Sequence, residues 1–369
     1  MCYTPMIYSK PFSSDAAYRA NPENGFQTCA ADRPLVAHFC GNDPDVLLSA
    51  AKYVVDDVDA IDLNLGCPQR VAHAGHFGSY LLDECDRELV CGIVRRLSDA
   101  LPVPVFCKIR LLDDIGSTLQ LVRQLEASGA SLIAVHARYR GSPTHRRDGP
   151  AHLDQVAVIK NSVRVPVLSN GNVRCWADVE ANLKITGADG IMSAEGLLDD
   201  PCLFSPTLAT ASGEEKQLLR RIEKKIKQVK ALQDKQLRGV TLSSEEIAKI
   251  GLQKSFNEER QRLLNSQGVG NKSPKLCDGL AKARRYLELA REYWMPPLST
   301  VLFHLRRMAK QELTKYCLME ELMASTKVET AEAVLSRAEC CRDTPEGDRS
   351  FDKSRAEQER KLREQRLYE

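Results

Sequence analysis

The sequence contains no run of about 18 apolar residues, and its N-terminus lacks the charged-then-apolar pattern of a secretory signal. Neither a membrane span nor secretion is therefore expected. It also has no Cys-x-x-Cys pair, and its 13 cysteines are odd in number and lie mostly inside apolar runs, as free thiols do. These features argue against a zinc or iron–sulfur site. They predict a cytoplasmic protein, with the nucleus as the alternative, that binds neither metal nor membrane.

A Gly-x-Gly-x-x-Gly turn, which usually follows the first strand of a doubly wound sheet, is missing as well. The first 205 residues instead alternate short apolar runs with stretches of helical spacing, such as 43–55 and 117–129. This alternation is typical of βα units around a parallel sheet. Seven strands are expected, at residues 2–7, 34–40, 60–66, 103–110, 131–138, 165–172 and 187–196.

Polar residues recur at the ends of these expected strands. They are Asn64 and Cys67, Lys108 and Arg110, His136 and Arg138, Asn170 and Asn172, and Glu195. In a TIM (β/α)8 barrel the carboxyl ends of the strands form the face that carries the active site, and the loops after the last two strands commonly hold a phosphate. An α/β barrel of this type, with one site at that face, is therefore predicted.

The second half of the chain is basic. Residues 211–369 hold 33 Lys and Arg against 25 Asp and Glu, a net charge of +8, whereas residues 1–210 have a net charge of −6. The basic half either contacts a polyanion or presents a solvated helical face of mixed charge. The expected domains are a barrel at 1–206, a charged and partly disordered insertion at 207–280, a helical domain at 281–345 and a charged tail at 346–369.

Residues 282–310 combine helical periodicity with arginines and aromatic residues. The arginines assigned to binding are Arg284, Arg285, Arg306 and Arg307, and Tyr286, Tyr293 and Trp294 lie among them. Because arginines contact phosphates and aromatic rings stack on unpaired bases, this pattern predicts an RNA-binding segment. An ordinary amphipathic helix pair with core aromatics is the alternative.

Five segments, in this order and at this spacing, carry a resemblance to a known family: DLNLGCPQRVAHAGHFGSYLL (62–82), CKIR (107–110), VHAR (135–138), SNGNV (169–173) and MSAEG (192–196). The chain resembles the dihydrouridine synthases, flavin-dependent enzymes that reduce uridine in tRNA, and most of all the branch that acts on tRNA positions 16 and 17. The resemblance covers about residues 2–206 and, weakly, 281–310. It implies a TIM barrel with FMN, NADPH or NADH as reductant, tRNA as partner and a helical tRNA-binding domain. We expect a monomer.

The resemblance suggests a role for Cys67. Reduction of the 5,6 bond of uracil requires a hydride at the carbon β to the carbonyl and a proton at the neighbouring carbon. A thiol of ordinary pKa, about 8.5, is protonated at pH 7 and can donate that proton. Gly66 and Pro68 restrict the backbone on both sides of Cys67. We therefore expect Cys67 to be the general acid, with a buried structural cysteine as the alternative.

Roles for the other strand-end residues follow from the same resemblance. Lys108 is expected to lie under the flavin ring, where a cation stabilises the anionic reduced form. The segment CKIR by itself leaves open a Schiff-base lysine or a lysine paired with a carboxylate. His136 is expected to bond the flavin, Arg138 to hold the ring or the uracil, and Asn64 and Arg110 to contact the substrate.

The last two strands are expected to hold the phosphate of the cofactor. The turn Asn170–Gly171–Asn172 offers backbone N–H groups, and Gly171 allows a close approach. Ala194 and Glu195 occupy the corresponding turn after the last strand, where many relatives carry Gly-Arg. The loss of that arginine weakens the case for a side-chain cation on the phosphate.

Two features depart from the family. His38 stands where the family has a glutamine that bonds the flavin ring, so a changed flavin affinity or redox potential is expected. Residues 2–7 correspond to the second strand of the family's barrel, so the first strand and helix are expected to be missing, with poor FMN binding and early unfolding. Two rival functions remain: a small-molecule flavin reductase resembling dihydroorotate dehydrogenases, and a catalytically inactive tRNA-binding protein.

Overall fold

The computed structural model describes residues 1–141 apart from 22 and 25, residues 149–205, 243–266 and 278–343, and short pieces between 221 and 236. The chain divides into two compact units. The first takes in residues 1–173, 178–194 and 289–301, and the second takes in the described residues among 174–177, 195–288 and 302–369. The predicted boundaries at 206, 280 and 345 remain predictions, and the predicted tail at 346–369 lies outside the described residues.

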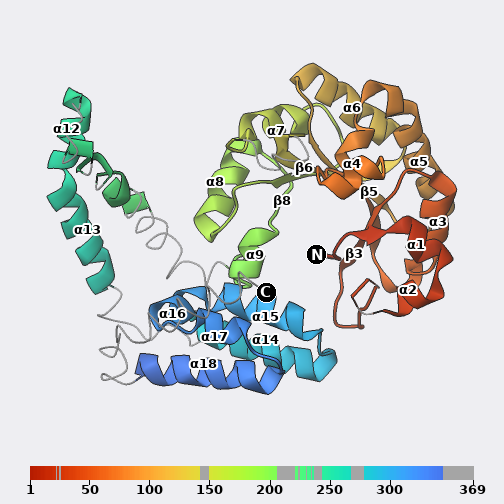
Figure 1. Ribbon diagram of the computed structural model, residues 1–369. Coiled ribbons are helices and arrows are strands. Elements are labelled where there is room, and N and C mark those ends of the chain that lie inside the picture. The colour runs from red at the N-terminus through yellow and green to blue at the C-terminus, as the bar shows by residue number, and fades with distance from the viewer. Residues whose placement is uncertain are drawn as a thin grey trace. The chain divides into compact units, whose positions relative to one another are not determined.

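A curled parallel sheet forms the first unit (Figure 1). Its strands are β1 (Cys2–Tyr3), β2 (Ile7–Tyr8), β3 (Leu35–Cys40), β4 (Ala60–Leu65), β5 (Val105–Leu111), β6 (Ala130–Tyr139), β7 (Val167–Asn170) and β8 (Gly190–Met192). β1 and β2 both pair with β3, so they are two pieces of one strand path. From β3 onward each strand pairs in parallel with the next one in sequence. The prediction of seven strand positions in an α/β fold of barrel type is confirmed, and within the described residues no pairing joins β8 to β1.

Helices follow the strands, and α3, α5 and α6 cover the outer face of the sheet (Figure 1). The helices of this unit are α1 (Ser9–Ser14), α2 (Ala16–Ala20), α3 (Pro44–Lys52), α4 (Arg70–Ala74), α5 (Arg87–Ala100), α6 (Ile115–Ala127), α7 (Leu153–Lys160) and α8 (Trp176–Thr186). Aspartates cap three of them: Asp15 accepts the N–H groups of Ala17 and Tyr18 at α2, Asp43 accepts those of Asp45 and Val46 at α3, and Asp114 accepts that of Ser117 at α6.

Side chains alternate between the two faces of the sheet, and this alternation separates two apolar regions. On the outer face Leu63, Leu65 and Ile109 join the main core beneath the helices. On the inner face a small cluster comprises Val36, Ala60, Phe106, Leu132 and Ala134. The next inward positions toward the carboxyl ends of β3, β4 and β5 are polar, so the same period of two that builds the core also gathers polar side chains at one edge.

The second unit is helical in its described part. Its helices, of which α14 and α15 also contribute residues to the first unit, are α9 (Glu195–Asp199), α12 (Ser244–Gly251), α13 (Gln253–Ser266), α14 (Gly279–Tyr293), α15 (Leu298–Met308), α16 (Lys310–Lys315), α17 (Met319–Met323) and α18 (Val328–Asp343). Leu287, Leu313 and Leu335 are buried from three of them, which gives the unit its own apolar core. Among the described helices none is both long and apolar enough to cross a bilayer.

Candidate functional site

Polar side chains from four neighbouring strands meet at the carboxyl-terminal edge of the sheet. The strand pairing sets Asn64 beside Lys108, Arg110 beside His136, and His136 beside Asn170. Because paired strands lie about 4.8 Å apart, these predicted site residues are direct neighbours. The structure therefore brings together the strand-end residues of β4 to β7 in one place.

In the turn after β4, hydrogen bonds fix the backbone of Cys67 at its N–H group and at its carbonyl group. The Asn64 side-chain oxygen accepts the backbone N–H groups of Gly66 and Cys67, each at 2.9 Å. The Cys67 carbonyl accepts the N–H of Ser79 at 3.1 Å and its hydroxyl at 3.0 Å. At Gly78, with φ of 67°, a Cβ atom would lie 2.8 Å from the Cys67 carbonyl oxygen, so this close approach requires glycine. The half-buried Cys67 thiol therefore projects from a turn with little freedom.

A buried carboxylate, which is not among the predicted site residues, lies on β4 two residues before Asn64. Asp62 is fully buried, and its Oδ2 atom lies 2.5 Å from Nδ1 of His38. The other ring nitrogen of His38, Nε2, lies 2.8 Å from the side-chain nitrogen of Asn64. Burial, together with the charge of Asp62, raises the pKa of the neighbouring Tyr3 hydroxyl well above its usual value. Both nitrogens of His38 are thus engaged within the protein, and the assignment of His38 to the cofactor remains a prediction.

The signal for Asp62 was present in the sequence. Asp62 precedes Asn64 by two residues in DLNLGC, so a strand places both side chains on the same face of the sheet. A carboxylate at an inward strand position needs a hydrogen-bonding partner. The inward position beside it on β3 is His38, since the two residues pair directly in the sheet.

Lys108 lies on the inner face of β5 and is half-buried. Burial lowers its pKa from 10.5 to about 8; Asp62 and Cys67 act in the opposite direction, and Arg110 adds to the lowering. An ammonium group with few neighbouring waters interacts strongly with an anion brought beside it. Lys108 therefore adds a partly desolvated cation to this strand edge.

Arg110 bonds the backbone on both sides of its strand. It is buried, and its guanidinium donates to the carbonyl oxygen of Gly66 at 2.9 Å and to that of Tyr139 at 3.1 Å. These bonds join the Cys67 turn to the end of β6. Arg110 therefore supports the site from below, and the assignment of Arg110 to the substrate remains an untested prediction.

His136, Arg138 and the turn after β7 form a second cluster. The Nη1 atom of Arg138 lies 3.0 Å from Nε2 of His136, and its other terminal nitrogen bonds the side-chain oxygen of Asn172. Asn170 donates to the carbonyl of Met192 at 2.8 Å and so joins β7 to β8. This cluster lies where the phosphate-holding turn was expected.

Gly171 within this turn has φ of 140°, a backbone conformation that favours glycine. A Cβ atom there would lie 3.1 Å from the Cβ of Ala151 and 3.7 Å from a ring carbon of His136. Ala151 therefore already fills the space beside Gly171, and the backbone conformation there requires glycine.

The remaining predicted residues lie at the end of the first unit or in the second. Ala194 is exposed directly after β8, and Glu195 begins α9, where its carbonyl accepts a bond from Arg307 at 3.2 Å. Arg307 also pairs with Asp199 at 3.0 Å. The structure therefore places Glu195 and Arg307 together within the second unit, and no relation to the strand-end site is assigned to them.

The other three predicted arginines of the second unit have distinct environments. Arg284 bonds both carboxylate oxygens of Glu339, at 3.1 and 2.9 Å. Arg285 pairs with Glu288 one turn along α14, at 3.0 Å. Arg306 lies over the ring of Phe303, 5.3 Å from its centroid. Of these three, Arg306 has the charge least neutralised by a carboxylate within the described residues.

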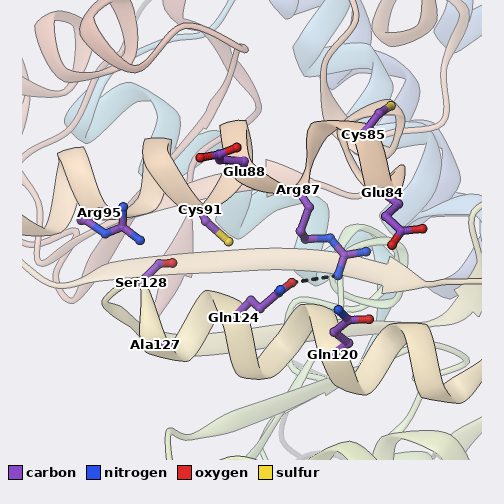
Figure 2. A pocket seen from close by; sticks show the side chains of 10 residues that line it. All are labelled: Glu84, Cys85, Arg87, Glu88, Cys91, Arg95, Gln120, Gln124, Ala127 and Ser128. Carbon is purple, nitrogen blue, oxygen red and sulfur yellow. Dashed lines mark hydrogen bonds between the residues drawn. The ribbon is translucent and has the colours of Figure 1, made fainter.

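A separate hollow of about 550 Å³ lies outside the sheet, between α5 and α6 (Figure 2). Arg87 reaches across it to Gln124, with 3.1 Å between Nη1 and the amide oxygen. Acidic and basic side chains both line it, and none of them is a predicted site residue. Among the described residues there is also no group of three or more His, Cys, Asp or Glu side chains arranged to hold a metal ion.

Comparison with known proteins agrees with this arrangement. A curated Mus musculus protein described as tRNA-dihydrouridine(16/17) synthase (NAD(P)(+))-like is 42% identical over 209 residues, which cover 55% of this chain and 42% of the relative. The Saccharomyces cerevisiae tRNA-dihydrouridine(16/17) synthase is 38% identical over 56% of this chain and 48% of the relative. A Homo sapiens tRNA-dihydrouridine(20a/20b) synthase-like protein is 37% identical over 56% of this chain and 63% of the relative.

The chain spans about half the length of the 16/17 relatives that it matches. Their identity of about 40% supports the predicted likeness to the 16/17 branch. The family profile described as dihydrouridine synthase (Dus) matches residues 1–281. With most of its length matched by that profile, and with the predicted motif residues gathered at one edge of a curled parallel sheet, the chain belongs to the dihydrouridine synthase family.

Proposed function

We propose that this protein reduces uridine to 5,6-dihydrouridine in tRNA, at D-loop positions 16 and 17, with FMN as cofactor and NADPH as reductant. The observation that carries the proposal is the Cys67 turn, in which Asn64 and Ser79 fix a half-buried thiol at the carboxyl end of β4. Lys108, the neighbour of Asn64 in the sheet, supplies the cation beside it. Reduction of an enone requires a proton donor, which Cys67 would supply, and Lys108 would stabilise the anionic reduced flavin that gives the hydride.

The residues of the first unit fit an anionic flavin. Lys108 offers an ammonium group in a poorly hydrated position, where it would stabilise negative charge on the ring. The turn Asn170–Gly171–Asn172 after β7 would offer backbone N–H groups to the phosphate. When bound, the flavin would supply the hydride for the uracil ring. His136 and Arg138 lie between the ring-binding lysine and the phosphate turn along the strand edge and would orient the cofactor.

The protein's own contribution to the chemistry is the proton. Cys67 would donate this proton to the uracil carbon next to the carbon that accepts the hydride. Because the Cys67 backbone is bonded at its N–H and at its carbonyl, the thiol would need little reorganisation to reach that carbon. The basic second half, with net charge +8 over residues 211–369, would hold the tRNA backbone.

A test of the function uses the full chain, FMN, NADPH and unmodified tRNA. We expect a flavin absorption spectrum for the complex and formation of dihydrouridine in tRNA, detected by mass spectrometry of nucleosides. Free uridine, tested in parallel, should be reduced at least about 100-fold more slowly, because it lacks the phosphate contacts that position the substrate. Equal turnover of free uridine would favour a small-molecule reductase, and tRNA binding by a colourless protein would contradict a flavin-dependent activity.

A further inference from the structure

We propose that His38 is a positioning residue: held by Asp62, it accepts a hydrogen bond from Asn64 and thereby fixes the side-chain orientation with which Asn64 holds the Cys67 turn. The catalytic meaning of this role rests on the proposed function. The role is based on three contacts in series, from Asp62 to His38, from His38 to Asn64, and from Asn64 to the backbone of Cys67.

The direction of each bond follows from the turn. The N–H groups of Gly66 and Cys67 are both donors, and they lie 2.9 Å from one atom of the Asn64 side chain. Only the amide oxygen can accept them, so the amide nitrogen must face the other way. That nitrogen lies 2.8 Å from Nε2 of His38, so Nε2 has to be the acceptor and carries no proton.

The same reasoning gives the direction of the hydrogen bond between His38 and Asp62. A neutral imidazole with a bare Nε2 carries its proton on Nδ1. Nδ1 lies 2.5 Å from a carboxylate oxygen of Asp62, which can only accept when ionised. Asp62 is completely buried and His38 is 9% exposed, so water does not compete for either bond. Asp62 therefore stabilises the tautomer of His38 whose Nε2 accepts a hydrogen bond from the amide nitrogen of Asn64.

The backbone holds His38 in place for this task. The N–H of His38 donates to the Thr4 hydroxyl at 3.0 Å, and the edge of the Tyr3 ring packs against the imidazole at 6.0 Å between centroids. Asn64 has one additional contact, to the sulfur of Met6 at 3.1 Å. Since thioether sulfur is a weak acceptor, His38 is the principal partner of the Asn64 amide nitrogen.

Amide-resolved hydrogen exchange on the full chain tests this role without requiring activity. The double variant His38→Phe/Asp62→Leu removes this chain of contacts without leaving Asp62 as a buried carboxylate that lacks a partner, and circular dichroism checks that the variant is folded. We expect the amides of Gly66 and Cys67 to exchange at least about tenfold faster in this variant, because their acceptor is no longer held. The amide of Ser117, which Asp114 caps in α6, is the matched control and should not change.

A second variant separates hydrogen bonding from packing. In His38→Gln the amide oxygen can still accept from Asn64, so exchange at Gly66 and Cys67 should stay within about twofold of the parent. Unchanged exchange in the double variant, equal acceleration at Ser117, or failure of the glutamine to restore slow exchange would each overturn the proposal. If the protein formed no dihydrouridine but showed the expected exchange pattern, the proposed function would fail and the positioning role would stand.

Discussion

Charged side chains have different surroundings in the two units. At the strand-end site Asp62 is fully buried, and its partner His38 is 9% exposed. In the second unit the pair of Arg285 and Glu288 is open to water, with side chains 52% and 61% exposed, whereas Lys282 in its pair with Asp200 is buried. Removal of a group from the strand-end site leaves another polar group buried without its partner, whereas water replaces the lost partner at the exposed pairs of the second unit. Single substitutions should therefore have large effects in the site and small, salt-dependent effects on the helical surface.

The largest effect on stability is expected at His38. In His38→Ala the carboxylate of Asp62 stays buried without its bond, which should lower the free energy of unfolding by about 3–5 kcal/mol. The matched change in the second unit, Arg284→Ala, removes the partner of Glu339 in a pair whose side chains are 29% and 28% exposed, and should cost about 1 kcal/mol or less. Urea unfolding of both variants measures the difference, and equal losses would contradict the distinction between the two regions.

A smaller effect, with a size that depends on pH, is expected at Lys108. Its pKa is lowered by burial from 10.5 to about 8, so between these values the unfolded state binds more protons than the folded state. Stability should therefore rise with pH in that interval through this group, and the burial penalty is fully present below about pH 8. Lys108→Met should remove this rise and add about 1–3 kcal/mol of stability at pH 7.

The control for this prediction is Lys160→Met. Lys160 pairs with Asp189 at 2.7 Å near the surface. Its replacement should leave the dependence of stability on pH between about 8 and 10 as in the parent. An unchanged slope in Lys108→Met, measured by denaturant unfolding across that interval, would mean that the lysine is not desolvated.

The smallest effect is expected for one arginine of the second unit. Arg306 stacks over Phe303 and has no carboxylate partner within the described residues, so its charge is available to a phosphate. On the proposed function, Arg306→Ala should weaken tRNA binding and reduce the slope of log affinity against log salt by about one. Arg284→Ala, whose charge is already neutralised by Glu339, should leave the slope unchanged. A reduced slope in Arg284→Ala together with an unchanged slope in Arg306→Ala would mean that the ion pairs of this unit open to bind RNA.

The sequence predicted the first unit well because its information there is local. Alternation of apolar runs with helical spacing located every strand position, and the strand at 105–111 differs from the expected 103–110 by two residues at its start and one at its end. Residues 64–67 come from one strand and its turn, so their proximity to Lys108 and His136 followed from the parallel sheet alone.

The side-chain contacts that the sequence did not predict join residues that are far apart in the chain. The roles of His38 and Asp62 arise from a contact across 24 residues, and the pairing of Arg284 with Glu339 spans 55. The bonds of the Arg110 guanidinium to the carbonyls of Gly66 and Tyr139 span 44 and 29 residues, and its predicted contact with the substrate remains a prediction. A side chain's type gives its chemical capacity, but its use depends on which groups the fold places within hydrogen-bonding distance.

The central claim, that the Cys67 thiol is the acid of the strand-end site, is tested most directly by a single turnover with pre-reduced flavin and unmodified tRNA. In the parent, reoxidation of the flavin should coincide with dihydrouridine formation. In Cys67→Ala reduction of the flavin by NADPH should be unchanged, while the rate of reoxidation by tRNA falls about 100-fold or more. Cys85→Ala, which removes an exposed thiol before α5, should behave as the parent does. Reoxidation by tRNA at the parent rate in Cys67→Ala would contradict the account.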